Sequence, residues 1–138
     1  MGQRGSHVGP LFFDGVALPG DALLGELHRG FYMIMSALEK GRVGIGALAV
    51  GIDQAGLEAA RDYARTRKQF GSSIADFQGI QWNLAQMAME IAAARGLVHR
   101  AALLLDNARP ATEASSMAKC YASDMAVRQT AEAQSERP

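Results

Sequence analysis

Apolar residues recur at helical spacing from residue 30 to residue 67 and predict a first long helix. They lie three, four, five or seven residues apart and form a broad stripe that we expect to face neighbouring helices: Ile34, Leu38, Ile45, Leu48, Ile52 and Leu57. Six glycines fall within the same stretch: Gly30, Gly41, Gly44, Gly46, Gly51 and Gly56. Because each interior glycine costs about 0.5–1 kcal/mol relative to alanine, this helix needs close packing to be stable.

Two more helices are predicted downstream. Ser73 and Asp76 resemble a capping box that opens a helix over residues 74–106, which Asn107 and Pro110 end. Its expected buried face comprises Trp82, Leu84, Met87, Ile91, Leu97, Val98 and Leu103 to Leu105. The third begins near Thr112, a candidate N-cap, and is expected to bury Met117, Tyr121, Met125 and Val127. Methionines 87, 89, 117 and 125 are interpreted as core residues. Long helices with short connections predict an all-α antiparallel bundle of three helices.

The segment before the first helix has a different character. Leu11 to Phe13 have β-propensity, and turn dipeptides follow at Asp14-Gly15 and Pro19-Gly20. Since a lone strand cannot bury its face, we interpret this segment as a short β and loop remnant of a sheet domain. The expected organisation is therefore residues 1–26 as the end of a β-domain with its linker, and residues 27–138 as an incomplete helical domain.

Composition narrows the classes of function. Fourteen basic residues balance fourteen acidic ones, so no net charge attracts nucleic acid or an anionic membrane. The apolar run Val43–Ile52 is too short to span a bilayer, and no export signal is recognisable. The single cysteine, Cys120, is expected to be buried and suits a reducing compartment. The three histidines are scattered, which predicts no metal site.

Residues 65–81, RTRKQFGSSIADFQGIQ, join the first two helices and carry the most informative chemistry. Their cations sit at a helix C-terminus, where they offset the helix dipole without any further role. Arg67 can also present a planar guanidinium to a pyrophosphate or carboxylate. Gln78 and Gln81 fall on the first turns of the next helix, where amides and free N–H groups can bind an anion or a heterocycle.

The pattern R-x-x-F-G-x-x-I-x-x-F-Q-x-x-Q, from Arg67 to Gln81, resembles the signature at this junction in the acyl-CoA dehydrogenase family. Leu11 to Phe31 resemble the exit from the family's middle β-domain. Glu39-Lys40-Gly41-Arg42 resembles its substrate-side segment, and Met117-Ala118-Lys119 its third helix. The similarity runs from about Leu11 to Ala133, and its consistent spacing across three zones makes it specific.

The resemblance implies roles by position. Arg67 would bind the FAD pyrophosphate of a neighbouring subunit, Gln78 would contact the same flavin nucleotide, and Phe70 would pack beside it. Gln69 is a further cofactor-binding candidate. The substrate-binding candidates are Glu39, Lys40, Gly41 and Arg42, with Arg42 the strongest because a guanidinium suits the phosphates and carbonyl oxygens of acyl-CoA.

The family removes two hydrogens from the α and β carbons of an acyl thioester, with a glutamate as base and the flavin as hydride acceptor. In most members that glutamate lies beyond the point where this sequence stops; in one branch it stands at the position of Gly41, which has no side chain. We therefore expect a truncated fragment without a catalytic residue of its own, inactive alone.

The resemblance further implies a homodimer or homotetramer, an electron-transfer flavoprotein or oxygen as electron acceptor, and a location in the bacterial cytoplasm or mitochondrial matrix. Two alternatives remain open at this point. The chain could be a non-catalytic helical oligomerisation module, or a fragment of a related acyl-CoA oxidase or flavin monooxygenase.

Overall fold

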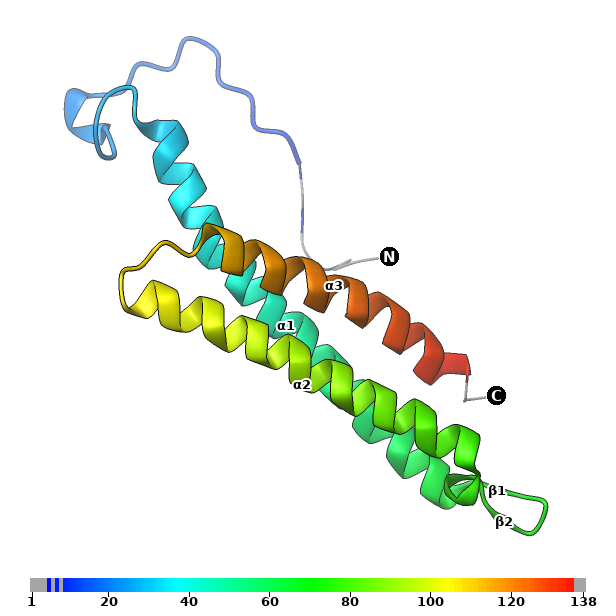
Figure 1. The fold of residues 1–138 in the computed structure, drawn as a ribbon. Coiled ribbons are helices and arrows are strands. Elements are labelled where there is room, and N and C mark those ends of the chain that lie inside the picture. The colour runs from blue at the N-terminus through cyan, green and yellow to red at the C-terminus, as the bar shows by residue number, and fades with distance from the viewer. Residues whose placement is uncertain (1–4, 6, 8, 136–138) are drawn as a thin grey trace. The chain divides into compact units, whose positions relative to one another are not determined.

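The computed structural model describes residues 5, 7 and 9–135 and is dominated by three long helices (Figure 1). The elements, in chain order, are a 3-10 helix η1 (Gly20–Ala22), α1 (Gly30–Thr66), β1 (Lys68–Gln69), β2 (Ser72–Ser73), a 3-10 helix η2 (Ile74–Asp76), α2 (Gln78–Asp106) and α3 (Thr112–Ser135). The predicted all-α class and three-helix architecture are confirmed. The last three residues, 136–138, lie outside the described part.

Residues up to Met33 form a compact unit separate from the bundle that starts at Ile34. Within the described residues 9–29 the only regular element is η1, so the strand predicted at Leu11 to Phe13 is wrong. Phe12 is 88% exposed, and this segment contains no second strand that could accept its backbone hydrogen bonds. The boundary between residues 26 and 27 stays a prediction.

α1 packs through a different face from the one its aliphatic residues predicted. The buried residues of this helix are small or polar: Gly46, Ala49, Val50, Asp53, Ala60 and Ala64. Of the predicted stripe, Leu57 is half-buried, whereas Ile34, Leu38, Ile45, Leu48 and Ile52 are 46–59% exposed. The helix therefore has two apolar faces, and the one with smaller side chains meets its neighbours.

α2 and α3 lie side by side and run in opposite directions (Figure 1). Alanines dominate their shared core, which contains Ala94, Ala101, Ala114, Ala118 and Ala122 together with the larger Ile91, Val98 and Met125. Small side chains let the two backbones approach closely, so the core depends on contact between helices more than on bulky side chains.

Several larger residues predicted for the core are at the surface instead. The exposed ones are Trp82, Met89, Leu103, Met117, Tyr121, Val127 and Cys120. Met87 and Met125 are buried as predicted, and Leu84, Leu97, Leu104 and Leu105 are half-buried. Because the buried stripe of a helix packed against two partners is narrow, it leaves the neighbouring apolar positions uncovered.

α1 is attached to both other helices by specific contacts. Gly46 lies so close to its neighbours that an added Cβ atom would stand 3.1 Å from Val98 Cγ2 and 3.4 Å from the Ala118 carbonyl oxygen. Arg95 of α2 donates a hydrogen bond to Gln54 Oε1 at 3.0 Å.

By length and composition α1 is also long and apolar enough to cross a membrane, a criterion that the core helix of a soluble protein meets as well.

The helix starts differ in detail from the prediction. Ser73 Oγ accepts from the Ala75 amide and donates to the Ala64 carbonyl, and it caps η2 rather than α2, which begins at Gln78. Thr112 is the first residue of α3, and its hydroxyl donates to Glu39 Oε1 of α1. The Ser73 hydroxyl thus ties the hairpin to the end of α1, and the Thr112 hydroxyl joins two helices distant in sequence. Local capping rules predict neither use.

Candidate functional site

The predicted cofactor residues gather at one end of the bundle, around the hairpin that links α1 to α2. β1 and β2 pair antiparallel, with Gln69 opposite Ser72. The two residues between them have positive φ, 53° at Phe70 and 85° at Gly71. This is the pattern of a type I′ hairpin turn, which glycine adopts freely and a bulky residue adopts at a cost.

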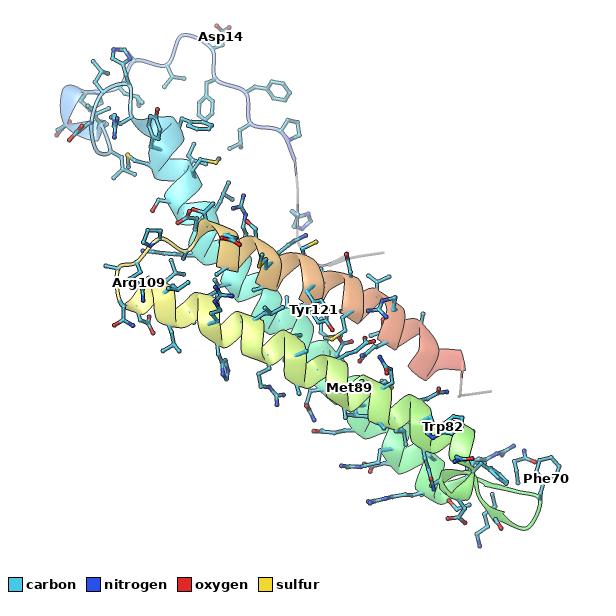
Figure 2. The ribbon with its side chains drawn as sticks, viewed as in Figure 1. Asp14, Phe70, Trp82, Met89, Arg109 and Tyr121 are labelled. Atoms are coloured by element: carbon cyan, nitrogen blue, oxygen red, sulfur yellow. The ribbon has the colours of Figure 1, made fainter. Side chains whose placement is uncertain are left out.

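Phe70 occupies the strained position at the tip of this hairpin (Figure 2). Its ring is 93% exposed and touches Phe77 edge to face, with 6.2 Å between ring centroids. An aromatic ring exposed to water contributes little to the stability of the fold, and the positive φ of its residue lowers that stability by about 1–3 kcal/mol. Since neither feature favours folding, the position is a candidate for contact with a partner or ligand.

Arg67 follows the last residue of α1, and its backbone ties the hairpin to both helices. Its amide donates to the Tyr63 carbonyl and its carbonyl accepts from the Ile74 amide, each at 2.9 Å. Within the described part of the chain the Arg67 side chain has no ion-pair or hydrogen-bond partner and is exposed. The guanidinium is therefore available to an anion outside the bundle.

Gln78 opens α2 beside this hairpin. No acidic residue stands in the first turn, and Phe77, in the capping position, provides no side-chain acceptor. The first amides of α2 are consequently available to an anion, and the positive end of the helix dipole favours one. Gln81, by contrast, donates through Nε2 to the Ala75 carbonyl at 2.9 Å and stabilises the turn itself.

These groups fit the chemistry of a flavin nucleotide. A free guanidinium and an uncapped helix N-terminus suit a pyrophosphate, an exposed phenyl ring suits a heterocycle, and the exposed amides of Gln69 and Gln78 can donate or accept. The hairpin brings all four predicted cofactor residues to one end of the bundle. Their roles toward a flavin stay predictions.

The predicted substrate segment lies in the first half of α1, and two of its four residues contact α3 while the other two are exposed. Glu39 accepts a hydrogen bond from Thr112, and Arg42 Nη1 donates to Ser116 Oγ at 3.3 Å. These two half-buried side chains hold α1 against the first turn of α3. Lys40 and Gly41 are exposed, and a Cβ atom added at Gly41 would meet nothing within 4 Å.

The two predicted sites are far apart in one chain. Arg42 and Arg67 are separated by 25 residues of almost continuous helix, a rise of roughly 38 Å. One copy of this bundle therefore cannot apply its Arg67 and its Arg42 to a single compact site. The role of Arg67 toward a neighbouring subunit stays a prediction.

Other features lie outside these two segments. One hollow of about 570 Å³ near the end of α2 is lined by His99, Arg100 and Arg109, and another of about 560 Å³ borders Cys120, Tyr121 and Arg128. Within the described residues no three metal-ligating side chains cluster. Sequence patterns did not reveal that Asp53 of α1 is buried near the charged residues Glu90 of α2 and Arg128 of α3, because these residues come from three different helices.

Known proteins resemble most of this chain. Residues 28–135 match the model of the family described as "Acyl-CoA dehydrogenase, C-terminal domain". A probable acyl-CoA dehydrogenase of Bacillus subtilis is 48% identical over 128 residues, which cover 93% of this chain and 34% of the relative. The short-chain specific mitochondrial acyl-CoA dehydrogenase of Bos taurus is 44% identical over 126 residues, or 91% of this chain and 31% of its own length.

Solved structures give the same result. The butyryl-CoA dehydrogenase of Megasphaera elsdenii superimposes with a TM-score of 0.87 at 42% identity, over 90% of this chain and 32% of that one. The chain thus spans about a third of the length of the relatives it matches.

Proposed function

This chain belongs to the acyl-CoA dehydrogenase family, and from that premise we propose that it contributes flavin-binding and subunit-contact surfaces to an FAD-dependent enzyme that oxidises acyl-CoA thioesters. The observation that carries the proposal is the Arg67 guanidinium, exposed and without a partner among the described residues, on the hairpin that leads into the uncapped start of α2. A dinucleotide pyrophosphate matches both groups in charge and geometry.

FAD, when bound, supplies the hydride acceptor for oxidation at the α and β carbons. The residues of this chain have simpler tasks. Arg67 and the first amides of α2 neutralise the pyrophosphate, Gln69 and Gln78 hydrogen-bond to the nucleotide, and Phe70 covers a ring face. Because Arg42 lies in the first half of α1 and Arg67 follows its last residue, we infer that they serve two different sites in a homodimer or homotetramer.

Arg42 and Lys40 would then hold the phosphates or carbonyl groups of acyl-CoA, with Gly41 leaving room beside them. We infer that the base is supplied by residues outside this sequence, so the 138-residue chain alone should not turn over acyl-CoA. Relatives include a caffeyl-CoA reductase-Etf complex subunit of Acetobacterium woodii at 42% identity. That name supports an electron-transfer flavoprotein, rather than oxygen, as the electron partner here.

The first experiment is an FAD titration of this chain, followed by flavin fluorescence. Because a charge-assisted hydrogen bond to phosphate contributes about 1.5–3 kcal/mol, Arg67→Ala should weaken binding roughly tenfold or more. Arg100→Ala, which removes an exposed arginine from the other end of α2, is the matched control and should leave the affinity unchanged. Equal affinities for all three proteins would contradict the assigned role of Arg67.

The second experiment tests function in a complete enzyme. Residues 11–135 replace the matching third of the Bacillus subtilis relative, and bound flavin and acyl-CoA oxidation are measured. The proposal expects a yellow, active chimera that loses flavin when Arg67 is changed to alanine. A folded, colourless oligomer that is insensitive to Arg67→Ala would favour the alternative of a non-catalytic helical module.

A further inference from the structure

Asp53 lies at the middle of α1, in the core of the bundle, and its side chain has no hydrogen-bond partner among the described residues. Its exposed fraction is 0%, and both of its carboxylate oxygens are buried without a donor. One other side-chain atom in the described residues shares this state: Oε1 of Gln129, a residue of α3 that is 2% exposed. Two buried acceptor groups thus lack donors in the same bundle.

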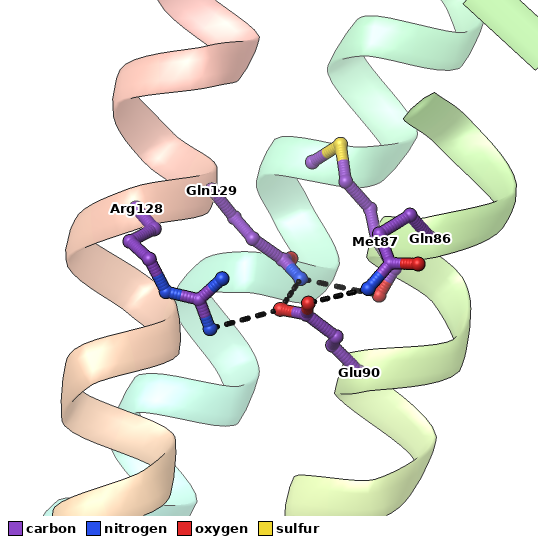
Figure 3. A network of polar contacts seen from close by, with 5 residues as sticks. All are labelled: Gln86, Met87, Glu90, Arg128 and Gln129. Atoms are coloured by element: carbon purple, nitrogen blue, oxygen red, sulfur yellow. Dashed lines mark hydrogen bonds and ion pairs between the residues drawn. The ribbon is translucent and has the colours of Figure 1, made fainter. Parts of the chain in front are cut away.

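The charged groups that act on Asp53 are Glu90 from α2 and Arg128 from α3. Glu90 already receives three donors (Figure 3). Gln86 Nε2 donates at 2.6 Å, Gln129 Nε2 at 3.0 Å and Arg128 Nη2 at 3.2 Å. Arg128 thus forms an ion pair with Glu90, and it is the only cation among the described residues that acts electrostatically on Asp53.

An ionised Asp53 would therefore be a fully buried negative charge near that of the half-buried Glu90, with one shared cation and no donor of its own among the described residues. Such a charge is far more costly to bury than a neutral acid, which needs one acceptor for its proton. The pKa of Asp53 is raised from 3.8 to about 6; burial is the largest cause, the Glu90 charge adds to the rise, and the Arg128 charge opposes it.

We propose that the folded bundle holds Asp53 as a neutral carboxylic acid, whose proton is donated to Oε1 of Gln129, and that loss of this proton loosens the packing of α1 on α2 and α3. The proton turns one Asp53 oxygen from an unpaired acceptor into a donor, and it supplies the donor that Gln129 Oε1 lacks. It also removes the repulsion from Glu90. This inference does not depend on the proposed enzymatic function, because none of these residues belongs to the candidate flavin or substrate segments.

The direction of the pH effect follows from linkage. The folded-state pKa of about 6 lies above the unfolded value of 3.8, so the folded bundle binds the proton more tightly. The resulting stabilisation is complete below the unfolded value and is lost as the pH rises through the folded value. Asp53 therefore makes the bundle more stable in acidic than in neutral solution.

The test compares urea unfolding of the 138-residue chain and its Asp53→Asn variant between pH 4.5 and 7.5, followed by circular dichroism. Asparagine keeps the size and polarity but has no charge to lose. From the two pKa values, the folding constant of the wild type relative to the variant should fall roughly 25-fold over this range. Glu58→Gln, which changes an exposed carboxylate on the same helix, is the control and should show no such trend. A wild-type to Asp53→Asn ratio that does not change with pH overturns the proposal.

A direct titration decides the matter even if Asp53→Asn fails to fold. In the wild-type chain labelled with ¹³C, the Asp53 carboxyl resonance should titrate near pH 6 in the folded state. A midpoint at or below the ordinary value of 3.8 would refute a buried neutral acid. In Gln129→Met the acceptor is missing, so the midpoint should move to lower pH; an unchanged midpoint would exclude Gln129 as the acceptor.

Discussion

The packing of α1 against α2 and α3 can be tested at two glycines of the same helix. Gly46 is buried at the helix interface, whereas Gly51, five residues later, is exposed and has open space around its missing Cβ. Both have helical backbone, so alanine at either position should gain about 0.5–1 kcal/mol from reduced chain entropy and better helix propensity. The two substitutions differ only in what the new methyl group meets.

At Gly46 the new methyl group would stand 3.1 Å from Val98 Cγ2 and 3.4 Å from the Ala118 carbonyl oxygen. The valine methyl can give way by a few tenths of an ångström, but the Ala118 backbone moves only if α3 moves. Overpacking of this kind typically costs about 1–3 kcal/mol, which cancels or exceeds the gain in helix propensity. Gly46→Ala is therefore expected to be neutral or destabilising by up to about 2 kcal/mol.

The assay is urea unfolding at constant pH, with Gly51→Ala and Gly46→Ala measured beside the wild type. Gly51→Ala should raise the free energy of unfolding by about 0.5–1 kcal/mol, so the two variants should differ by about 1–3 kcal/mol. Equal stabilisation by both would refute the close approach of α1 to Val98 and Ala118.

Three further predictions address the core, the polar network and the hairpin. Met125 is 0% exposed, so Met125→Ala should lower the free energy of unfolding by about 2–5 kcal/mol. Val127 is 70% exposed, so Val127→Ala should change it by less than about 0.5 kcal/mol. Comparable losses for the two variants in urea titrations would contradict the orientation of α3. Hydrogen bonds from Gln86, then Gln129 and Arg128, lower the pKa of Glu90 below its usual 4.5, so the stabilisation by the ionised Glu90 is present above that value and lost as the pH falls. The destabilisation caused by Glu90→Gln should therefore shrink in acid. A difference in unfolding free energy that stays constant from about pH 3 to 7 would argue against the network. Phe70→Asn places a residue that tolerates positive φ at the hairpin tip, so it should stabilise the chain by about 1 kcal/mol while weakening FAD binding. A variant that is both less stable and unchanged in flavin affinity would contradict the proposed role of the hairpin.

The candidate cofactor site could be anticipated because it is built from one short stretch of chain. Arg67 to Gln78 contain a helix end, a two-residue turn and a helix start, and local backbone preferences determine each of them. The substrate segment was less accessible to sequence reasoning. Glu39 and Arg42 contact Thr112 and Ser116, more than 70 residues away, and no local pattern encodes such contacts.

The amino-acid sequence by itself determined that three long helices form and, within a few residues, where they start and stop. Helical periodicity and terminating residues such as Asn107 and Pro110 are local signals, so they act before any tertiary contact exists. The same periodicity could not show which apolar face of α1 would be buried, since both faces repeat at 3.6 residues per turn.

Only the tertiary structure decided that question. Close approach of the alanine-rich α2–α3 pair favours small side chains, so Gly46 and Ala49 of α1 are buried while Ile45 and Ile52 remain in solvent. It also decided the surroundings of Asp53, because the charges of Glu90 and Arg128 reach that carboxylate only after three helices have met. Such properties depend on distances across the bundle, which a linear pattern of residues does not contain.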